Sequence, residues 1–267
     1  MTARHWIAIA CTAIGLSIDG CASWHATPAL PSRSHMVLDQ LDIVSDTPLP
    51  QHHRLLEELR AQRQMLSTKL GLPLSEEPIH VYLFASGEKL AAYMRVHFPG
   101  LPARRAFFVE SDTKLNVYAY WGDRVAEDLR HEVAHGYLHS VVPNLPLWLD
   151  EGLAEYFEVS RGLDGVNRPH VDQLTADPQR PWQPDLERLE QLRDTEEMTQ
   201  AEYAQSWAWT HFMLESSPQR LQILQGYLQT LARRQTPESL SIQLRRADAR
   251  YQQNVAQHVS VLHQSLR

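Results

Sequence analysis

Two histidines and a glutamate in one short segment have the types and spacing of a metal-dependent hydrolase site. His131 and His135 are four residues apart, and Glu132 directly follows the first. On an α-helix this spacing brings both imidazoles to one face, one turn apart, where they can bind the same ion. Glu132 then lies about 100° around the helix from His131. Its carboxylate can reach a water on the ion without being a ligand, which is the arrangement of zinc hydrolases.

The flanking residues favour a metal site over a polar helix that carries two histidines by chance. Apolar side chains fill most of the remaining positions: Val133, Ala134, Tyr137, Leu138, Val141 and Val142. The helix is therefore expected to be buried, and buried imidazoles need polar partners. A metal ion with an acidic third ligand meets that need. His139 continues the four-residue spacing but lies about 80° around the helix from His131, so it is not expected to bind the ion.

The third ligand is expected on the next helix. Prolines at 143 and 146 end the first helix, and the apolar pattern of residues 147–157 predicts a second. A short turn makes the two helices antiparallel neighbours, so Glu151 faces back towards the histidines. Asp150 and Glu155 are the competing carboxylates. Glu155 lies one turn after Glu151, where it can accept a hydrogen bond from a ligating imidazole and fix its tautomer.

These segments resemble a known family. HEVAH followed by WLDEGLAEYFE, residues 148–158, is similar to the gluzincin metallopeptidases, and most of all to the peptidase MA-like group with its DUF1570-type domain. In that pattern the Glu before Gly completes the zinc site, which implies Glu151 here. The resemblance is strongest over residues 125–160 and extends over about 35–215. The chain lacks the G-x-M-E-N sequence with which M1-type aminopeptidases hold a free substrate amine.

The resemblance implies an α+β fold with a gluzincin-like, thermolysin-type core: a small β-sheet, the HExxH helix and the glutamate helix, followed by C-terminal helices. Alternation predicts strands at 41–44, 79–84, 107–109 and 115–120. Apolar spacing predicts helices at 51–70, 88–98, from about 124, and at 198–215, 218–234 and within 238–266. Residues 161–184 are expected to form a loop beside the cleft. In such folds a strand near the metal helix pairs with the substrate backbone; Lys114–Tyr120 is the candidate, and an ordinary hairpin strand is the alternative.

The first residues have the pattern of an export signal. A 12-residue apolar run, Ile7 to Ile18, is too short to span a bilayer. The following Gly20-Cys21-Ala22-Ser23 resembles a bacterial lipobox, so Cys21 is the expected lipidation site, and simple cleavage nearby is the alternative. Both cysteines lie in this segment, and a cysteine-free mature domain fits the periplasm. The expected layout is a signal peptide at 1–20, a tether at 21–35, a zinc metallopeptidase-like domain at 36–215 and a helical extension at 216–267.

Composition limits the partners. A hydrophobic fraction of 43% suffices for an ordinary core, and the net charge is −7. No basic patch is evident, so nucleic acid is not an expected partner. A peptide or protein substrate is expected, and a membrane only through a lipid anchor at Cys21.

The resulting hypothesis is a zinc-dependent peptidase of the bacterial cell envelope. One zinc ion per chain would be held by His131, His135 and Glu151, with Glu132 moving a proton from the attacking water to the leaving amine. Such sites need a donor for the developing oxyanion. Tyr203 is the candidate, because the MA-like pattern has a similar Y-x-x-S/A-W helix; the alternative is a core tyrosine packed among tryptophans. The competing function is a zinc-binding, non-catalytic envelope lipoprotein that acts in assembly or interaction.

Overall fold

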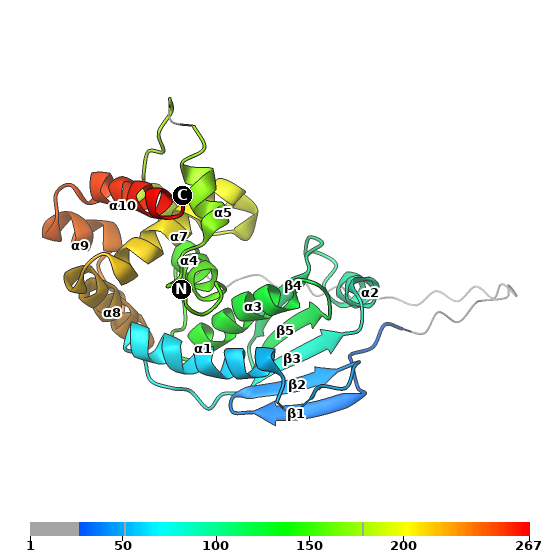
Figure 1. Ribbon diagram of the computed structural model, residues 1–267. Coiled ribbons are helices and arrows are strands. Elements are labelled where there is room, and N and C mark those ends of the chain that lie inside the picture. The colour runs from blue at the N-terminus through cyan, green and yellow to red at the C-terminus, as the bar shows by residue number, and fades with distance from the viewer. Residues whose placement is uncertain (1–26, 51, 178) are drawn as a thin grey trace, which may run out of the picture.

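The computed structural model describes residues 27–50, 52–177 and 179–267, and within these ranges the fold is α+β (Figure 1). Five strands form one sheet in the order β1-β2-β3-β5-β4. The strands are β1 (Ser34–Leu38), β2 (Leu41–Ser45), β3 (Ile79–Phe84), β4 (Ala106–Ser111) and β5 (Lys114–Tyr120). The pairs β1–β2 and β4–β5 are antiparallel hairpins, while β2, β3 and β5 run parallel.

Helices cover both faces of this sheet. The first group comprises α1 (Arg54–Leu70), α2 (Gly87–His97), α3 (Val125–His139) and α4 (Leu147–Phe157). One sheet face packs under α1 and α3 through side chains that are almost fully buried, among them Leu41, Ile79, Val81 and Val117. On the other face α2 contacts a separate apolar cluster of Phe84, Leu90, Tyr93, Met94, Phe107 and Tyr118.

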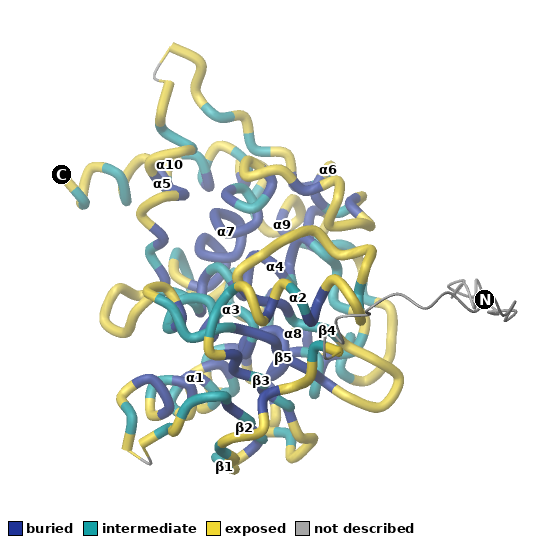
Figure 2. Tube along the Cα trace, turned by 90° about the vertical axis from the view of Figure 1, so that its right-hand side faces the viewer, coloured by how far each residue is buried: buried dark blue, intermediate teal, exposed yellow. Residues whose placement is uncertain are grey.

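The remaining helices form a block on the α3 side of the sheet (Figure 1). They are α5 (Arg168–Leu174), α6 (Leu186–Leu189), a 3₁₀ turn (Thr195–Glu197), α7 (Gln200–Glu215), α8 (Pro218–Ala232), α9 (Leu240–Ala247) and α10 (Tyr251–Ser265). Figure 2 shows α7 as a largely buried helix at the centre of this block. One buried cluster runs from Leu41 to Val259, so the C-terminal helices share the core of the sheet and its helices. Among the described residues, no helix is long and apolar enough to cross a membrane.

Gly152 sets the distance between α4 and α7. A Cβ atom at this position would lie 2.4 Å from both the Ser206 carbonyl oxygen and the Thr210 hydroxyl oxygen. Such contacts are too close for any side chain, so the glycine after Glu151 lets α7 lie against α4. The same approach brings Tyr203, at the start of α7, towards the histidine helix.

Three expectations from sequence differ from the fold. The strand β1 was not predicted, because at the sheet edge its side chains are only half buried and its alternation is weak. Residues 161–184 are not all loop: α5 lies within them, and Pro169 is near its first position, where proline favours a helix start.

The third difference concerns substrate pairing. The candidate strand, β5, lies between β3 and β4 and is hydrogen-bonded on both edges, so it cannot accept another strand. The free edge on the side of α3 belongs to β4 instead. The export signal and Cys21 lie outside the described residues.

A buried histidine pair joins α7 to α10. His211 is 2% exposed, and its Nδ1 lies 2.9 Å from Nε2 of His258. Burial, reinforced by the charge of His258, lowers the pKa of His211 to about 4. Burial also lowers the pKa of His258. Both rings are therefore neutral in the folded protein at neutral pH.

This pair predicts a loss of stability in mild acid. The unfolded chain binds a proton at the ordinary histidine pKa, while folded His211 binds one only near pH 4, so stability falls as pH drops between these values. The loss between pH 7.5 and pH 5 should be about 2 kcal/mol. Chemical denaturation at both pH values should show a smaller pH effect for His211→Gln than for wild type. His52→Gln, at an exposed position, is the control; an unchanged pH effect in His211→Gln would contradict the assignment.

Candidate metal centre

The two histidines of the HExxH sequence lie on α3, which is fixed by its apolar face. Val133, Ala134 and Leu138 are fully buried. The turn after α3 contains Asn144 at φ 60°, a left-handed conformation that asparagine tolerates. It reverses the chain so that α4 returns antiparallel beside α3.

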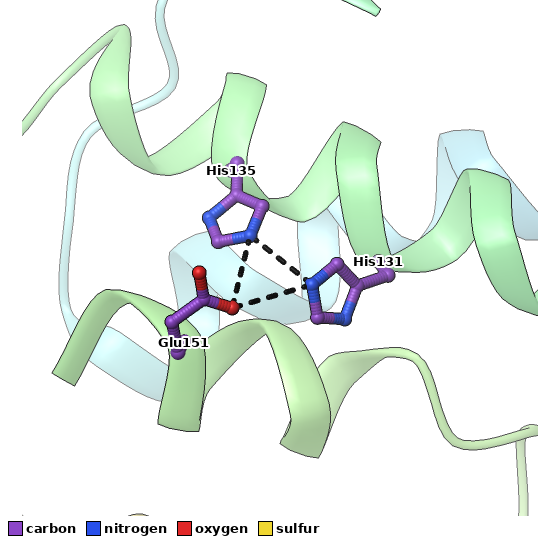
Figure 3. Close-up of side chains that lie close together, drawn as sticks. All are labelled: His131, His135 and Glu151. Atoms are coloured by element: carbon purple, nitrogen blue, oxygen red, sulfur yellow. Dashed lines mark hydrogen bonds and ion pairs between the residues drawn. The ribbon is translucent and has the colours of Figure 1, made fainter. Parts of the chain in front are cut away.

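His131, His135 and Glu151 converge on one point (Figure 3). The Nε2 atoms of the two histidines are 3.2 Å apart. Oε2 of Glu151 lies 3.5 Å from Nε2 of His131 and 3.7 Å from Nε2 of His135. A tetrahedral zinc ion with ordinary bond lengths separates its ligand atoms by about 3.4 Å. The three side chains, each less than a fifth exposed, thus fit a single metal ion.

The far nitrogen of each imidazole is held by a carboxylate. Nδ1 of His131 lies 3.0 Å from Glu158, and Nδ1 of His135 lies 2.9 Å from Asp150. Since a carboxylate accepts, each Nδ1 carries the proton and donates it. Both Nε2 lone pairs then face the shared point, which is the tautomer a metal ligand requires.

Glu155 does not have the role expected from sequence. Its Oε2 lies 2.7 Å from Nε2 of His170 on α5 and accepts from Asn167 at 3.1 Å. Because α3 and α4 are antiparallel, the earlier histidine faces the later part of α4. His131 therefore meets Glu158, two turns after Glu151, and Glu155 turns towards α5.

The competing residues Asp150 and His139 support the site from outside. Asp150 accepts from both His135 and His139, and these two partners outweigh burial and hold its pKa well below the usual range. Nδ1 of His139 lies 2.6 Å from Glu110 on β4. With both ring nitrogens facing carboxylates, His139 has its pKa raised to about 10 despite burial.

Two further groups of side chains are close enough to hold an ion: His135 with His139 and Asp150, and His131 with Glu155 and Glu158. Each of them shares a histidine with the group of His131, His135 and Glu151.

The electrostatics of the cluster favour a bound cation. Burial lowers the pKa of His131, but Glu151 and Glu158 outweigh it and raise that pKa well above the usual value. The pKa of His135 is raised in the same way by Asp150 and Glu151. The surrounding carboxylates thus stabilise positive charge at the point where the three ligand atoms meet.

A cavity of about 730 Å³ opens beside the cluster. His131, Glu132 and Glu151 line it together with Tyr203 from α7 and Arg104 from the loop before β4. Among the residues that the structure describes, none hydrogen-bonds the Glu132 carboxylate. Burial raises its pKa, while the charges of the two histidines act in the opposite direction.

Tyr203 brings a hydroxyl group to the same cavity. Its phenol oxygen is buried and has no hydrogen-bond partner within the described ranges. Burial and the charge of Glu151 raise its pKa, so the phenol keeps its proton at neutral pH and can donate.

Several residues of the site were not foreseen from sequence. Glu158 carried a signal, since it lies seven residues after Glu151 and so on the same helix face. Asn167 and Arg104 carried none, because the segments that contain them reach the cavity only through tertiary packing.

A family model described as "Protein of unknown function (DUF1570)" matches residues 125–238. The match begins at the first residue of α3 and extends past the end of α8, so it includes the whole histidine–glutamate cluster and Tyr203. It agrees with the DUF1570-type resemblance and assigns no activity. No curated protein matches the chain.

The carboxylate partners predict which variants weaken metal binding. Glu158→Gln should raise the zinc dissociation constant about 10- to 100-fold, because the amide orients His131 less firmly. Glu155→Gln, the same change one turn earlier on the side of α5, should have a smaller effect. Competition with a chromogenic chelator measures both constants, and His135→Ala and Glu151→Ala should abolish tight binding. Tight zinc binding in Glu151→Ala, or a larger effect for Glu155→Gln than for Glu158→Gln, would contradict the arrangement.

Proposed function

We propose that the protein is a zinc-dependent peptidase with a gluzincin-like core. One observation carries the proposal: three ligand atoms with metal spacing face a cavity that also holds a free carboxylate, Glu132, and an unpartnered phenol, Tyr203. A site that only binds metal has no use for either group. Two neutral imidazoles and one carboxylate, with room for a further ligand, are a donor set of catalytic zinc sites.

When bound, zinc supplies a Lewis acid that polarises a carbonyl and makes water nucleophilic at neutral pH. The side chains supply the rest. Glu132 accepts the proton of the attacking water and returns it to the amine that leaves, so the peptide bond breaks into a carboxylate and an amine. Tyr203 donates its hydroxyl proton in a hydrogen bond to the carbonyl oxygen as negative charge develops there.

The free edge of β4 is suited to hold an extended peptide beside the site. The ring of Phe108 on this strand stacks on His135 with a centroid distance of 5.7 Å, so the edge runs past the cluster. Backbone groups along an open edge can pair with an added strand. The edge of β4 takes the role that the sequence suggested for β5.

The cellular location forms part of the proposal. The export signal at 1–20 and lipidation at Cys21, both expected from sequence, favour a protein anchored at the periplasmic side of the bacterial envelope. A zinc lipoprotein without activity is the alternative, and the variant of the catalytic base distinguishes the two functions.

Glu132→Gln should retain zinc and lose peptide hydrolysis. The amide keeps the size of the side chain but cannot accept the proton, and acid–base catalysis contributes about 10²–10⁴-fold. A proteomic cleavage profile of wild type and variant measures this, together with zinc content. Glu127→Gln makes the same change on the same helix and also lines the cavity, and should stay active. A wild type that holds zinc and cleaves nothing would favour the non-catalytic function.

Tyr203→Phe should lower kcat about 10²–10³-fold, since one oxyanion donor is worth about 2.7–4 kcal/mol of transition-state stabilisation. The ring remains, and the lost hydroxyl has no partner in the fold, so KM and the melting temperature should barely change. Steady-state kinetics and thermal unfolding measure these effects. Tyr227→Phe, on α8 away from the cavity, is the control. A near wild-type kcat in Tyr203→Phe would leave this tyrosine a packing role only.

A further inference from the structure

Most charged side chains around the cavity already have partners. On the wall formed by α4 and α5, Glu155 and Glu158 accept hydrogen bonds from His170, Asn167 and His131. Both carboxylates on this wall therefore already have hydrogen-bond donors. A substrate amine or other cation would have to break these hydrogen bonds.

Three arginines also line the cavity, and two of them are paired. Arg105 binds Asp128 through two nitrogens, at 2.7 to 3.1 Å. Arg124 forms an ion pair with Glu127. Arg104 lies beside the phenol of Tyr203 and forms no ion pair with any residue in the described part of the chain. It is exposed, and it lines the cavity together with Glu132 and Tyr203.

We propose that Arg104 binds a carboxylate of the substrate, so that the site prefers acidic peptides. This inference rests on the proposed peptidase function and deepens it. A guanidinium forms two parallel hydrogen bonds with a carboxylate, which gives both affinity and orientation. Unlike Arg105 and Arg124, Arg104 can bind a carboxylate without breaking an ion pair within the protein.

The neighbouring charges confine a substrate carboxylate to this place. Four carboxylates, Glu127, Asp128, Glu155 and Glu158, also line the cavity, so a negative group elsewhere in it meets like charge. The positive charge of Arg104 also acts on the Glu132 carboxylate and the Tyr203 phenol, which places it near the reacting groups.

The position of Arg104 on the chain limits where the substrate carboxylate lies. Arg104 is two residues before β4, and Phe108 of β4 stacks on His135. At about 3.3 Å per extended residue, and allowing for the long arginine side chain, the carboxylate belongs about one or two residues from the bond that is cut. It comes either from an acidic side chain or from the free C-terminus of the peptide.

The test measures peptide binding, with and without zinc, to the Glu132→Gln protein, so that cleavage is not needed. Three acetylated hexa-alanine probes are compared by calorimetry: one with an amidated C-terminus, one with a free C-terminus, and one amidated with Glu at the fourth position. At least one acidic probe should bind about tenfold or more tightly than the neutral one, since hydrogen bonds to charged groups are strong. Adding Arg104→Gln should abolish the difference, and Arg104→Lys should retain part of it. Arg124→Gln, at an ion-paired arginine that also lines the cavity, should leave this difference in affinity unchanged.

Each outcome decides something. Tighter binding of the free-acid probe alone identifies a terminal carboxylate, and tighter binding of the Glu probe alone identifies a side chain. Equal binding of all three probes, no binding of any, or a preference that survives Arg104→Gln would overturn the inference. If acidic probes bind more tightly only when Arg104 is present, but the wild-type protein cleaves no peptide, the anion site stands and the proposed peptidase function is rejected. If the wild-type protein cleaves peptides without a preference for acidic ones, the peptidase function stands and the role of Arg104 is rejected.

Discussion

Two imidazoles buried side by side on one helix impose the constraint on which the rest of this structure depends. Buried nitrogens need partners, and here each outer nitrogen has a carboxylate from α4: Glu158 for His131 and Asp150 for His135. The antiparallel packing of α3 and α4 matches the order of these pairs. It also places Glu151 between them, opposite both inner nitrogens. The convergence of the three candidate ligand atoms thus follows from the hydrogen bonds that the two imidazoles need where α3 packs against α4.

A second contact extends the site beyond this helix pair. Because Gly152 has no side chain, α7 can lie so close to α4 that a Cβ atom at this position would collide with the Ser206 carbonyl oxygen. Tyr203 and the buried tryptophans Trp207 and Trp209 belong to this helix, and Trp207 donates to the carbonyl of Gly165 in the loop before α5. The phenol therefore stands on a helix fixed by packing at its centre and by a capping box at its start. Such support is what a preformed hydrogen-bond donor requires.

Sequence alone predicted the local part of the site well. The spacing of His131 and His135 and the glutamate on the next helix are features within single helices, where the period of 3.6 residues determines what shares a face. Relations between elements were harder. Whether Glu155 or Glu158 contacts His131 depends on how far α3 and α4 are shifted along each other. Whether β4 or β5 has a free edge depends on the order of the strands in the sheet. Arg104 had no sequence signal, since its importance lies in the partners that its neighbours already have.

The order of these residues along the chain has a consequence for how the protein folds. From His131 to Glu158, one helix, one turn and one more helix contain all three candidate ligands and both supporting carboxylates. Short loops close at low entropic cost, and contacts near in sequence form fastest. The helical hairpin that carries the candidate ligands is thus built from local contacts, whereas Tyr203 and the loop of Arg104 join it from distant segments. Assembly from the hairpin outward would prepare the ligand face before the cavity is enclosed.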